Sequence, residues 1–336
     1  MAEPKLLFEL NNLTKHFPLK KETLFQKEQL VVRANENISI NIYQGETLGL
    51  VGESGCGKST LGRTLLRLYP VTSGDIWYHG RLDEAGKPIN LATADKETIR
   101  PLRKDLQLIF QDPYSSLNPR MTVGQIIAEG LFAHGVFDKN SEESQEYILK
   151  TMEDCGLAPY FVHRYPHQFS GGQRQRIGIA RSVAMKPKFI VADEPVSALD
   201  VSIQSQIINL MLDLKERDNL TYLFISHDLS VIKYISDRIG VMYLGDIVEL
   251  ASTPDLFDRR LHPYTEALLS AIPTTDIRET VEIKLKEGEM PSPINPPSGC
   301  KFHTRCPYAQ DRCKEEVPLL RELKPNHHVA CHFPLL

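Results

Sequence analysis

The chain has 336 residues, of which 41% are hydrophobic and 24% are charged, and its formal net charge is −4. This length allows about two domains with ample core, and the composition is that of an ordinary globular protein. There is no long block of Lys or Arg, so the electrostatic footprint of a nucleic-acid binder is missing. No apolar run approaches the roughly 18–20 residues that a membrane-spanning helix needs, and the N-terminus lacks the apolar segment of a secretory signal. We therefore expect a cytosolic protein that reaches a membrane only through partners.

The predicted strands are of two kinds. Residues 38–42 alternate between apolar and polar side chains, which indicates a half-solvated antiparallel strand, and part of 74–79 does the same. Four other runs are nearly continuous in apolar residues, as in parallel strands that are buried on both faces; they are residues 47–51, 106–110, 189–192 and 222–225. Helical patterns separate several of these runs, so the sequence predicts an α/β fold with helices flanking a parallel sheet.

A phosphate-binding loop follows the first buried strand. The stretch matches G-x-x-x-x-G-K-[ST] and leads into a helical pattern at 61–68; it consists of Gly52, Glu53, Ser54, Gly55, Cys56, Gly57, Lys58, Ser59 and Thr60. Its glycines let backbone N–H groups surround an anion at the N-terminus of a helix. In this chemistry Lys58 reaches the β- and γ-phosphates of a nucleotide, and the Ser59 hydroxyl ligates Mg²⁺. We interpret the Cys56 thiol as a small filler rather than a nucleophile.

A second group of residues suited to phosphate chemistry follows the predicted strand at 189–192. Asp193 and Glu194 follow it directly, at the sheet edge where α/β proteins bind ligands. Asp193 is suited to holding Mg²⁺ or its waters, and Glu194 to polarising an attacking water as a general base. Between the second and third buried runs, the periodicity of residues 123–132 and 144–155 predicts an inserted helical subdomain.

A second anion site is predicted at Ser170, Gly171, Gly172 and Gln173, because the serine caps a helix and the glycines expose backbone N–H groups. This stretch resembles the signature sequence of ATP-binding-cassette (ABC) ATPases. The resemblance implies a P-loop NTPase cassette over residues 1–260, with a RecA-like parallel core, an antiparallel β subdomain and a helical subdomain over about 112–185. It also implies that two cassettes pack head to tail, so that the signature of one completes the ATP site of the other.

Further motifs stand in the order of that family. Gln111 resembles the Q-loop glutamine, which touches Mg²⁺ and water, and Asp200 belongs to a D-loop that crosses to the neighbouring cassette. His227 resembles the switch histidine that links the γ-phosphate to Glu194. Neighbouring residues on an extended segment point to opposite sides, so Ser226, His227 and Asp228 do not form a hydrolytic triad. Phe17 resembles the aromatic residue that stacks on adenine, with a core phenylalanine as the alternative.

Longer stretches resemble the ATP-binding subunits of oligopeptide and dipeptide importers, with the F-type subunit the most similar; they include residues 110–120, 164–167, 262–265 and 291–299. The resemblance implies a second cassette (a D-type paralogue or a second copy), two membrane permeases and an extracytoplasmic peptide-binding protein. It places the protein at the cytoplasmic face of the inner membrane. Since the chain lacks a block of basic residues, no nucleic-acid partner is expected. Relatives also import nickel, glutathione or sugars. A soluble ABC ATPase without permeases and a non-catalytic regulatory subunit are the alternatives from other functional classes.

A Pro-rich linker at 290–299 leads to four cysteines of a C-terminal module, for which residues 261–336 are expected; these are Cys300, Cys306, Cys313 and Cys331. Disulfides are disfavoured in the cytosol, which leaves a metal site or buried thiols. Four thiolates suit either Zn²⁺ or a four-iron, four-sulfur (4Fe–4S) cluster, and the spacing does not decide between them. The resemblance to the peptide-importer C-terminal module favours the cluster. His303 and His332 lie near enough in sequence to be ligands, with ordinary surface histidines as the alternative.

Overall fold

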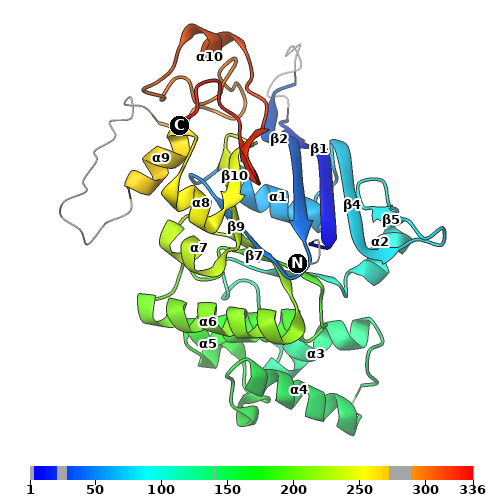
Figure 1. The fold of residues 1–336 in the computed structure, drawn as a ribbon. Helices are drawn as coiled ribbons and strands as arrows, with labels where there is room; N and C mark the ends of the chain where they lie inside the picture. The colour runs from blue at the N-terminus through cyan, green and yellow to red at the C-terminus, as the bar shows by residue number, and fades with distance from the viewer. Residues whose placement is uncertain (1–3, 21–28, 140, 272–288, 336) are drawn as a thin grey trace. The chain divides into compact units, whose positions relative to one another are not determined.

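The computed structural model describes residues 4–20, 29–139, 141–271 and 289–335, and it divides into two compact units. Unit 1 consists of residues 1–8, 42–46 and 78–225, and unit 2 of residues 9–41, 47–77 and 226–336. Each unit contains parallel strands that are flanked by helices (Figure 1). The expected α/β fold class is confirmed.

Unit 1 is built on three parallel strands in the order β8-β7-β6, which are Thr221–Ile225, Phe189–Asp193 and Leu106–Ile109. Phe189 pairs with Leu106 on one side and with Thr221 on the other. Every residue of β7 and β8 is buried, as their continuous apolar sequences predict. Because the three strands run in one direction, the residues that follow them emerge at one edge of the sheet.

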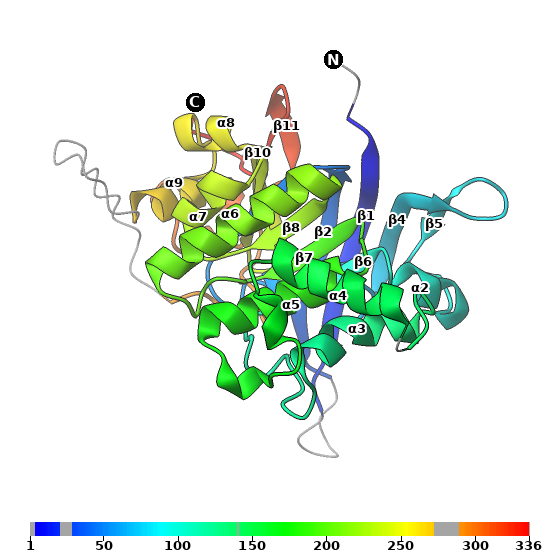
Figure 2. The ribbon, with the colours of Figure 1, turned by 90° about the horizontal axis from the view of Figure 1, so that it is seen from below.

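The helices of unit 1 include the two that were predicted at 123–132 and 144–155. Its helical elements are α2 (Lys96–Leu102), α3 (Val123–Ala133), α4 (Glu142–Asp154), η1 (Pro159–Phe161), η2 (Pro166–Gln168), α5 (Gly171–Val183) and α6 (Val201–Asp218). Helices α3, α4 and α5 contact one another and lie side by side (Figure 2). Caps fix where they begin: Thr122 forms a capping box with Gln125 before α3, and Ser141 caps α4.

Unit 2 contains a mixed sheet in the order β11-β12-β10-β9-β3. These strands are Arg321–Lys324, His327–Val329, Asp246–Ser252, Arg238–Tyr243 and Thr47–Val51. β3 and β9 are parallel, whereas β10 is antiparallel to both β9 and β12. Through β12 the segment near the C-terminus pairs with β10. The helices of this unit are α1 (Lys58–Leu65), α7 (Leu229–Ile235), α8 (Thr253–Asp258), α9 (Pro263–Ser270) and α10 (Asp311–Glu315).

A further sheet has the order β2-β1-β4-β5, formed by Val31–Tyr43, Leu6–Pro18, Ser73–Leu82 and Pro88–Asn90. In β2 the side chains of Ile38, Ile40 and Ile42 are buried, while Ser39 and Asn41 are exposed. This confirms the strand that the alternation predicts.

The helix after the phosphate loop and the Pro-rich linker were both predicted from the sequence. The helix predicted at 61–68 begins at Lys58, after the cap residue Gly57, and ends at Leu65. Arg67 has a left-handed backbone with φ of 53°, which is incompatible with continuing the helix. The Pro-rich linker at 290–299 forms neither helix nor strand, as predicted.

Candidate functional site

The phosphate loop lies between β3 and α1 in unit 2 and has a backbone that only glycine tolerates at two points. Gly52 has φ of 150°, and a Cβ there would lie 2.2 Å from the Met242 carbonyl oxygen. Gly57 has φ of 110°, and its Cβ would lie 2.1 Å from the Ala34 carbonyl oxygen. Close approach of neighbouring backbone therefore requires these glycines, in addition to their role in exposing N–H groups.

Lys58 is 5% exposed and folds back over its own loop. Its Nζ donates hydrogen bonds to the carbonyl oxygens of Gly52 (2.7 Å) and Glu53 (2.9 Å). The ammonium group thus lies among the backbone groups that would surround a phosphate. Burial raises the pKa of the neighbouring Cys56 thiol, despite the opposing effect of Lys58. A protonated, buried thiol supports the interpretation of Cys56 as a filler.

Phe17 is half-buried on β1, in the same unit as the phosphate loop. Its ring meets Tyr69 edge to face with 5.2 Å between ring centroids, and the Lys15 ammonium lies 4.5 Å from the ring centre. The ring is therefore held in a defined position but is not part of the closed core. Both interpretations of Phe17, an adenine platform and a packing residue, remain compatible with these contacts.

The acidic pair lies at the end of β7 in unit 1. Asp193 is 1% exposed and is the last residue of the strand, while Glu194 has a left-handed backbone with φ of 48°. The Glu194 N–H donates to the Ile225 carbonyl oxygen of β8 at 3.0 Å. Such a conformation costs a non-glycine residue of order 1–3 kcal/mol and is concentrated at functional sites.

Gln111 and Glu194 meet at the edge of this sheet. The Gln111 Nε2 donates to the Glu194 Oε2 at 3.0 Å, although the residues are 83 positions apart in the sequence. Their strands, β6 and β7, are adjacent and parallel, so both residues emerge at the same edge. The structure thus brings together a glutamine and a carboxylate that the sequence analysis selected from separate motifs.

The signature residues begin α5 as predicted. The Ser170 Oγ accepts from the Gln173 N–H at 3.3 Å, and the Gln173 Oε1 accepts from the Ser170 N–H at 3.1 Å, which forms a capping box. Ser170 and Gly171 are exposed at the N-terminus of this helix. The exposed Asp200 precedes α6, and its side chain forms no capping hydrogen bond. These residues therefore present their polar groups at the surface of unit 1.

His227 is exposed in unit 2 and precedes α7. The Asp228 carboxylate caps α7 by accepting from the N–H groups of Ser230 (2.8 Å) and Val231 (3.3 Å). The Ser226 Oγ accepts from the Asp228 N–H at 3.0 Å. The side chains of Ser226 and Asp228 thus form hydrogen bonds with the backbone of a turn and of a helix cap. These contacts are consistent with the absence of a hydrolytic triad.

The four C-terminal cysteines line one cavity, together with His262, Phe302 and Tyr308. Burial raises the pKa of Cys300 to about 12 and that of Cys331 to about 11, so these thiols are protonated without a cation. Among the described residues, no three His, Cys, Asp or Glu side chains are arranged to hold a metal ion. The arrangement of these side chains therefore does not support the expected metal centre, whether a 4Fe–4S cluster or zinc. His303 and His332 also line this cavity, and their imidazoles contact the backbone carbonyl oxygens of Cys300 and Glu316, at 2.8 and 2.9 Å.

One buried polar cluster escaped the sequence analysis. Glu249 on β10 is fully buried, and its carboxylate accepts from the N–H groups of Leu261 (2.6 Å) and His262 (3.0 Å) and contacts the His327 Nε2 at 2.7 Å. Glu249 thus joins β10 to the start of α9 and to β12. The signal in the sequence was a single acidic residue within the otherwise apolar run of residues 247–251.

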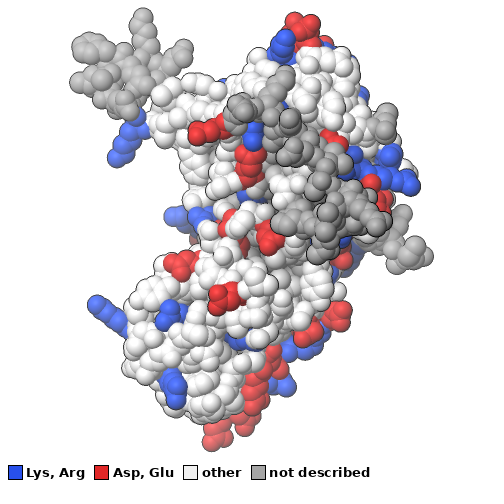
Figure 3. All heavy atoms as spheres, turned by 90° about the vertical axis from the view of Figure 1, so that its left-hand side faces the viewer, with Lys and Arg blue, Asp and Glu red and all other residues white. Residues whose placement is uncertain are grey.

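The distribution of surface charge and the character of the helices bear on contacts with nucleic acids and membranes. On the face in Figure 3, basic side chains are scattered among acidic and uncharged surface. Within the parts of the chain that the structure describes, no helix has the length and apolar character required to cross a bilayer.

Comparison with known proteins identifies the class. Residues 35–197 match the ABC transporter family, and residues 248–313 match the C-terminal region of oligopeptide/dipeptide transporters. The chain aligns over 74% of its length with the dimeric ATP-binding cassette MJ0796 bound to ADP and phosphate, with a TM-score of 0.63 and 27% identity, and it covers 99% of that structure. A cassette of Clostridium perfringens, cbiO1, shares the fold with a TM-score of 0.62 over 76% of this chain and 92% of that chain. The phosphate loop, acidic pair and signature helix thus define an ABC-type ATPase.

Two relatives narrow the assignment. The oligopeptide transport ATP-binding protein AppF of Bacillus subtilis is 51% identical over 99% of this chain and 98% of its own length. A putative peptide import ATP-binding protein of Brucella ovis is 50% identical over 98% of both chains. The chain belongs to the ABC transporter family, in the branch of ATP-binding proteins that carry the oligopeptide/dipeptide transporter C-terminal region.

Proposed function

We propose that this ATPase drives the import of dipeptides or oligopeptides, by hydrolysing ATP between two cassettes that are attached to membrane permeases. The ATPase class follows from the family. The peptide solute is supported by the names of the relatives and by the matched C-terminal region. The observation that carries the catalytic part is the contact between Gln111 and Glu194, because it orients a carboxylate at the sheet edge where the reaction would occur.

In the proposed site, Lys58 binds the β- and γ-phosphates, the loop from Gly52 to Thr60 surrounds them, and Phe17 stacks on adenine. Mg²⁺ would be held by Ser59, Gln111 and Asp193 and would offset charge on the phosphates. Glu194 accepts a proton from water as the water oxygen bonds to the γ-phosphorus. The bond from that phosphorus to the β–γ bridging oxygen breaks, which yields ADP and phosphate. His227 would contact the γ-phosphate and link it to Glu194.

A second cassette completes the site in this proposal. The exposed start of α5, from Ser170 to Gln173, would face the γ-phosphate bound by the partner, and Asp200 would cross the same interface. ATP then holds two cassettes together, and loss of phosphate lets them part. The helical region would transmit this motion to the permeases. The sister is a D-type paralogue or a second copy.

The remaining components follow from the transporter class. Two permeases would form the passage, an extracytoplasmic binding protein would deliver the peptide, and this chain would act at the cytoplasmic face of the inner membrane without a nucleic-acid partner. The cassette is proposed to span residues 1–260 and the C-terminal module residues 261–336. Nickel, glutathione or a sugar is the alternative solute, and a soluble ATPase without permeases is the alternative class.

The variant Glu194→Gln tests the catalytic role. It removes the base while keeping the size of the side chain, so we expect ATP to bind, turnover to fall about 100-fold and the ATP-bound dimer to accumulate. Glu216→Gln, on the exposed face of α6, is the matched control. Phosphate release and size-exclusion chromatography with ATP report the two effects. Unchanged turnover in Glu194→Gln would exclude the proposed base.

Transport tests the solute. The ATPase, its sister, both permeases and the binding protein would be reconstituted in vesicles with ATP on the cassette side. We expect labelled dipeptides or oligopeptides to accumulate, and nickel, glutathione and sugars not to compete. Uptake of one of these competitors instead would replace the solute, whereas turnover that never responds to permeases would favour the soluble class.

We also propose that the cysteine cavity holds a 4Fe–4S cluster rather than zinc. A zinc ion needs its thiolates about 2.3 Å from one centre, whereas a cluster takes one thiolate on each of four irons and so suits a wider ring of cysteines. The four cysteines line one cavity, which supports a shared set of ligands. Cys300, Cys306, Cys313 and Cys331 would hold it, and bound iron would offset the charge of the ionised thiols.

Anaerobic purification tests this proposal. We expect about four irons per chain and a visible absorbance band, both lost when Cys306 and Cys313 are replaced by serine. Cys155→Ser, at a buried cysteine outside this cavity, is the control and should retain the iron. Stoichiometric zinc without iron, or no metal at all, would contradict the proposal.

A further inference from the structure

The loop between the first two C-terminal cysteines, residues 300–306, reaches the phosphate loop. The Arg305 Nη1 lies 2.8 Å from Oε1 and 3.0 Å from Oε2 of Glu53, the second residue of the phosphate loop. The Arg305 side chain is 11% exposed and that of Glu53 is 30% exposed. This ion pair is partly shielded from water, so it is stronger than an ordinary surface pair.

The same residue of the phosphate loop is held a second time through its backbone. The Glu53 N–H donates to the Tyr264 hydroxyl oxygen at 2.9 Å, and Tyr264 lies on α9. The Phe302 ring, from the cysteine loop, packs against Tyr264 and Tyr243 with centroid separations of 5.3 and 5.2 Å. The carboxylate and the backbone of Glu53 are therefore both fixed by elements that lie far beyond the phosphate loop in the sequence.

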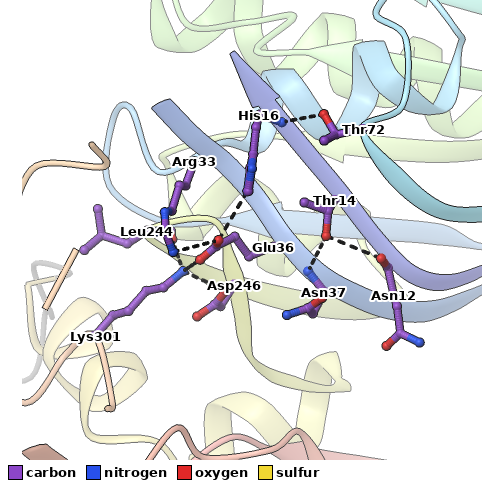
Figure 4. A network of polar contacts seen from close by, with 10 residues as sticks. All are labelled: Asn12, Thr14, His16, Arg33, Glu36, Asn37, Thr72, Leu244, Asp246 and Lys301. Carbon is purple, nitrogen blue, oxygen red and sulfur yellow. Dashed lines mark hydrogen bonds and ion pairs between the residues drawn. The ribbon is translucent and has the colours of Figure 1, made fainter. Parts of the chain in front are cut away.

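Lys301 attaches the other end of this loop (Figure 4). Its Nζ lies 2.9 Å from a carboxylate oxygen of Glu36 and 2.9 Å from one of Asp246, and it donates to the Leu244 carbonyl oxygen at 2.8 Å. Glu36 also contacts the Nε2 of His16 at 3.2 Å. Because Lys301 is anchored on β2 and on the turn between β9 and β10, the loop that carries Arg305 has a fixed base.

Charge gives this attachment a role in nucleotide binding. The phosphate loop binds an anion, and an unpaired carboxylate on its second residue would repel that anion. We propose that Arg305 is a positioning residue for ATP that acts through charge: it neutralises Glu53, so that no unpaired carboxylate repels the phosphates, while Tyr264 holds the backbone of the loop. The inference rests on the proposed role of the phosphate loop, and it makes the C-terminal module part of the nucleotide site's support.

Three variants test the proposal through the affinity for Mg-ATP, measured by titration calorimetry on the full chain. Arg305→Gln leaves Glu53 unpaired, so we expect the dissociation constant to rise about tenfold, which corresponds to 1.4 kcal/mol. Glu53→Gln removes the repelling charge and leaves Arg305, so we expect binding about threefold tighter than in the natural protein. In the double variant the two changes offset each other, and affinity returns to within about threefold of the starting value.

The opposite signs of the two single variants separate charge neutralisation by Arg305 from mere structural support. If Arg305 only stabilised the fold, both single variants would weaken binding and the double variant would not recover, which would overturn the proposal. Arg305→Lys keeps the charge and should retain most of the affinity, whereas Arg312→Gln removes an exposed arginine of the same module and should match the natural protein. In turnover assays Arg305→Gln should raise KM for ATP about tenfold and leave kcat within about twofold.

The variant Lys58→Ala tests the assignment of the phosphate loop separately from the role of Arg305. If this variant binds ATP normally, the phosphate-loop assignment itself is wrong. If Lys58→Ala loses ATP binding while Arg305→Gln binds as tightly as the natural protein, only the role of Arg305 is overturned. Circular dichroism on each variant shows whether it is folded, and the tighter binding expected of Glu53→Gln does not depend on the stability of Arg305→Gln.

Discussion

Replacing Glu249 with alanine should strongly destabilise unit 2. The carboxylate is fully buried and accepts hydrogen bonds from two backbone N–H groups and from the His327 ring. Hydrogen bonds to charged groups contribute about 1.5 kcal/mol or more each, so three of them amount to about 4–5 kcal/mol. Relief from burying the charge reduces this loss slightly. We expect Glu249→Ala to lower the free energy of unfolding by about 4 kcal/mol.

The variant Glu249→Gln separates the effect of the charge from that of the whole side chain. It keeps one acceptor oxygen but loses the charge and places an NH₂ group among donors, so we expect a loss of about 2 kcal/mol. Glu316→Ala is the control, because Glu316 pairs with Arg312 on the exposed surface of the same module, and its midpoint of unfolding should not change.

Urea unfolding, followed by far-ultraviolet circular dichroism and by the fluorescence of Trp77, the only tryptophan, measures these changes. With an m-value of about 3 kcal/mol per molar, the loss in Glu249→Ala corresponds to a fall in midpoint of about 1.3 M. A midpoint for Glu249→Ala equal to that of Glu316→Ala would refute the reasoning, because it would show that the buried carboxylate does not hold α9 and β12 against β10.

Three further outcomes are expected. Burial lowers the pKa of His262 to about 4, so the unfolded chain binds more protons than the folded one between pH 4 and 6.5. The contribution of His262 to the free energy of unfolding should therefore be full above pH 6.5 and fall by about 3 kcal/mol towards pH 4. His262→Asn, which keeps a helix cap, should flatten this slope in acid-unfolding curves. Gln111→Ala should slow ATP turnover about tenfold while ATP still binds, since Glu194 loses its orienting donor; equal phosphate release would contradict this. Cys56 should resist iodoacetamide at pH 8 until the protein is unfolded, as mass spectrometry can show, and rapid labelling of the native protein would disprove its burial.

Prediction from the sequence was most successful where each strand has a uniform environment. β3, β7 and β8 are buried along their whole length, so their apolar sequences identified them. Strands β9 and β10 were not identified. β9 contains Gly240, and β10 contains Glu249 in the middle of its apolar run, which obscures the pattern. The partners that make a buried glutamate acceptable in β10 lie 12 to 78 residues later in the chain.

The motif residues of the candidate site were also visible in the sequence. The phosphate loop, the cap formed by Ser170 and the carboxylates at the end of β7 depend on backbone conformations that residues a few positions apart impose on one another. The expectation of a metal ligand set showed the limit of this approach, because the spacing of cysteines indicates that they can meet but not how closely.

By itself, the sequence determined the local chemistry of this protein: an anion-binding loop, a capped signature helix and an acidic strand end. Only the tertiary structure decided which of these groups meet. Gln111 contacts Glu194 across 83 residues because two parallel strands are neighbours, and Arg305 reaches Glu53 across 252 residues because the C-terminal chain pairs with β10. Contacts of this kind depend on the packing of whole elements, and no short-range pattern in the chain encodes them.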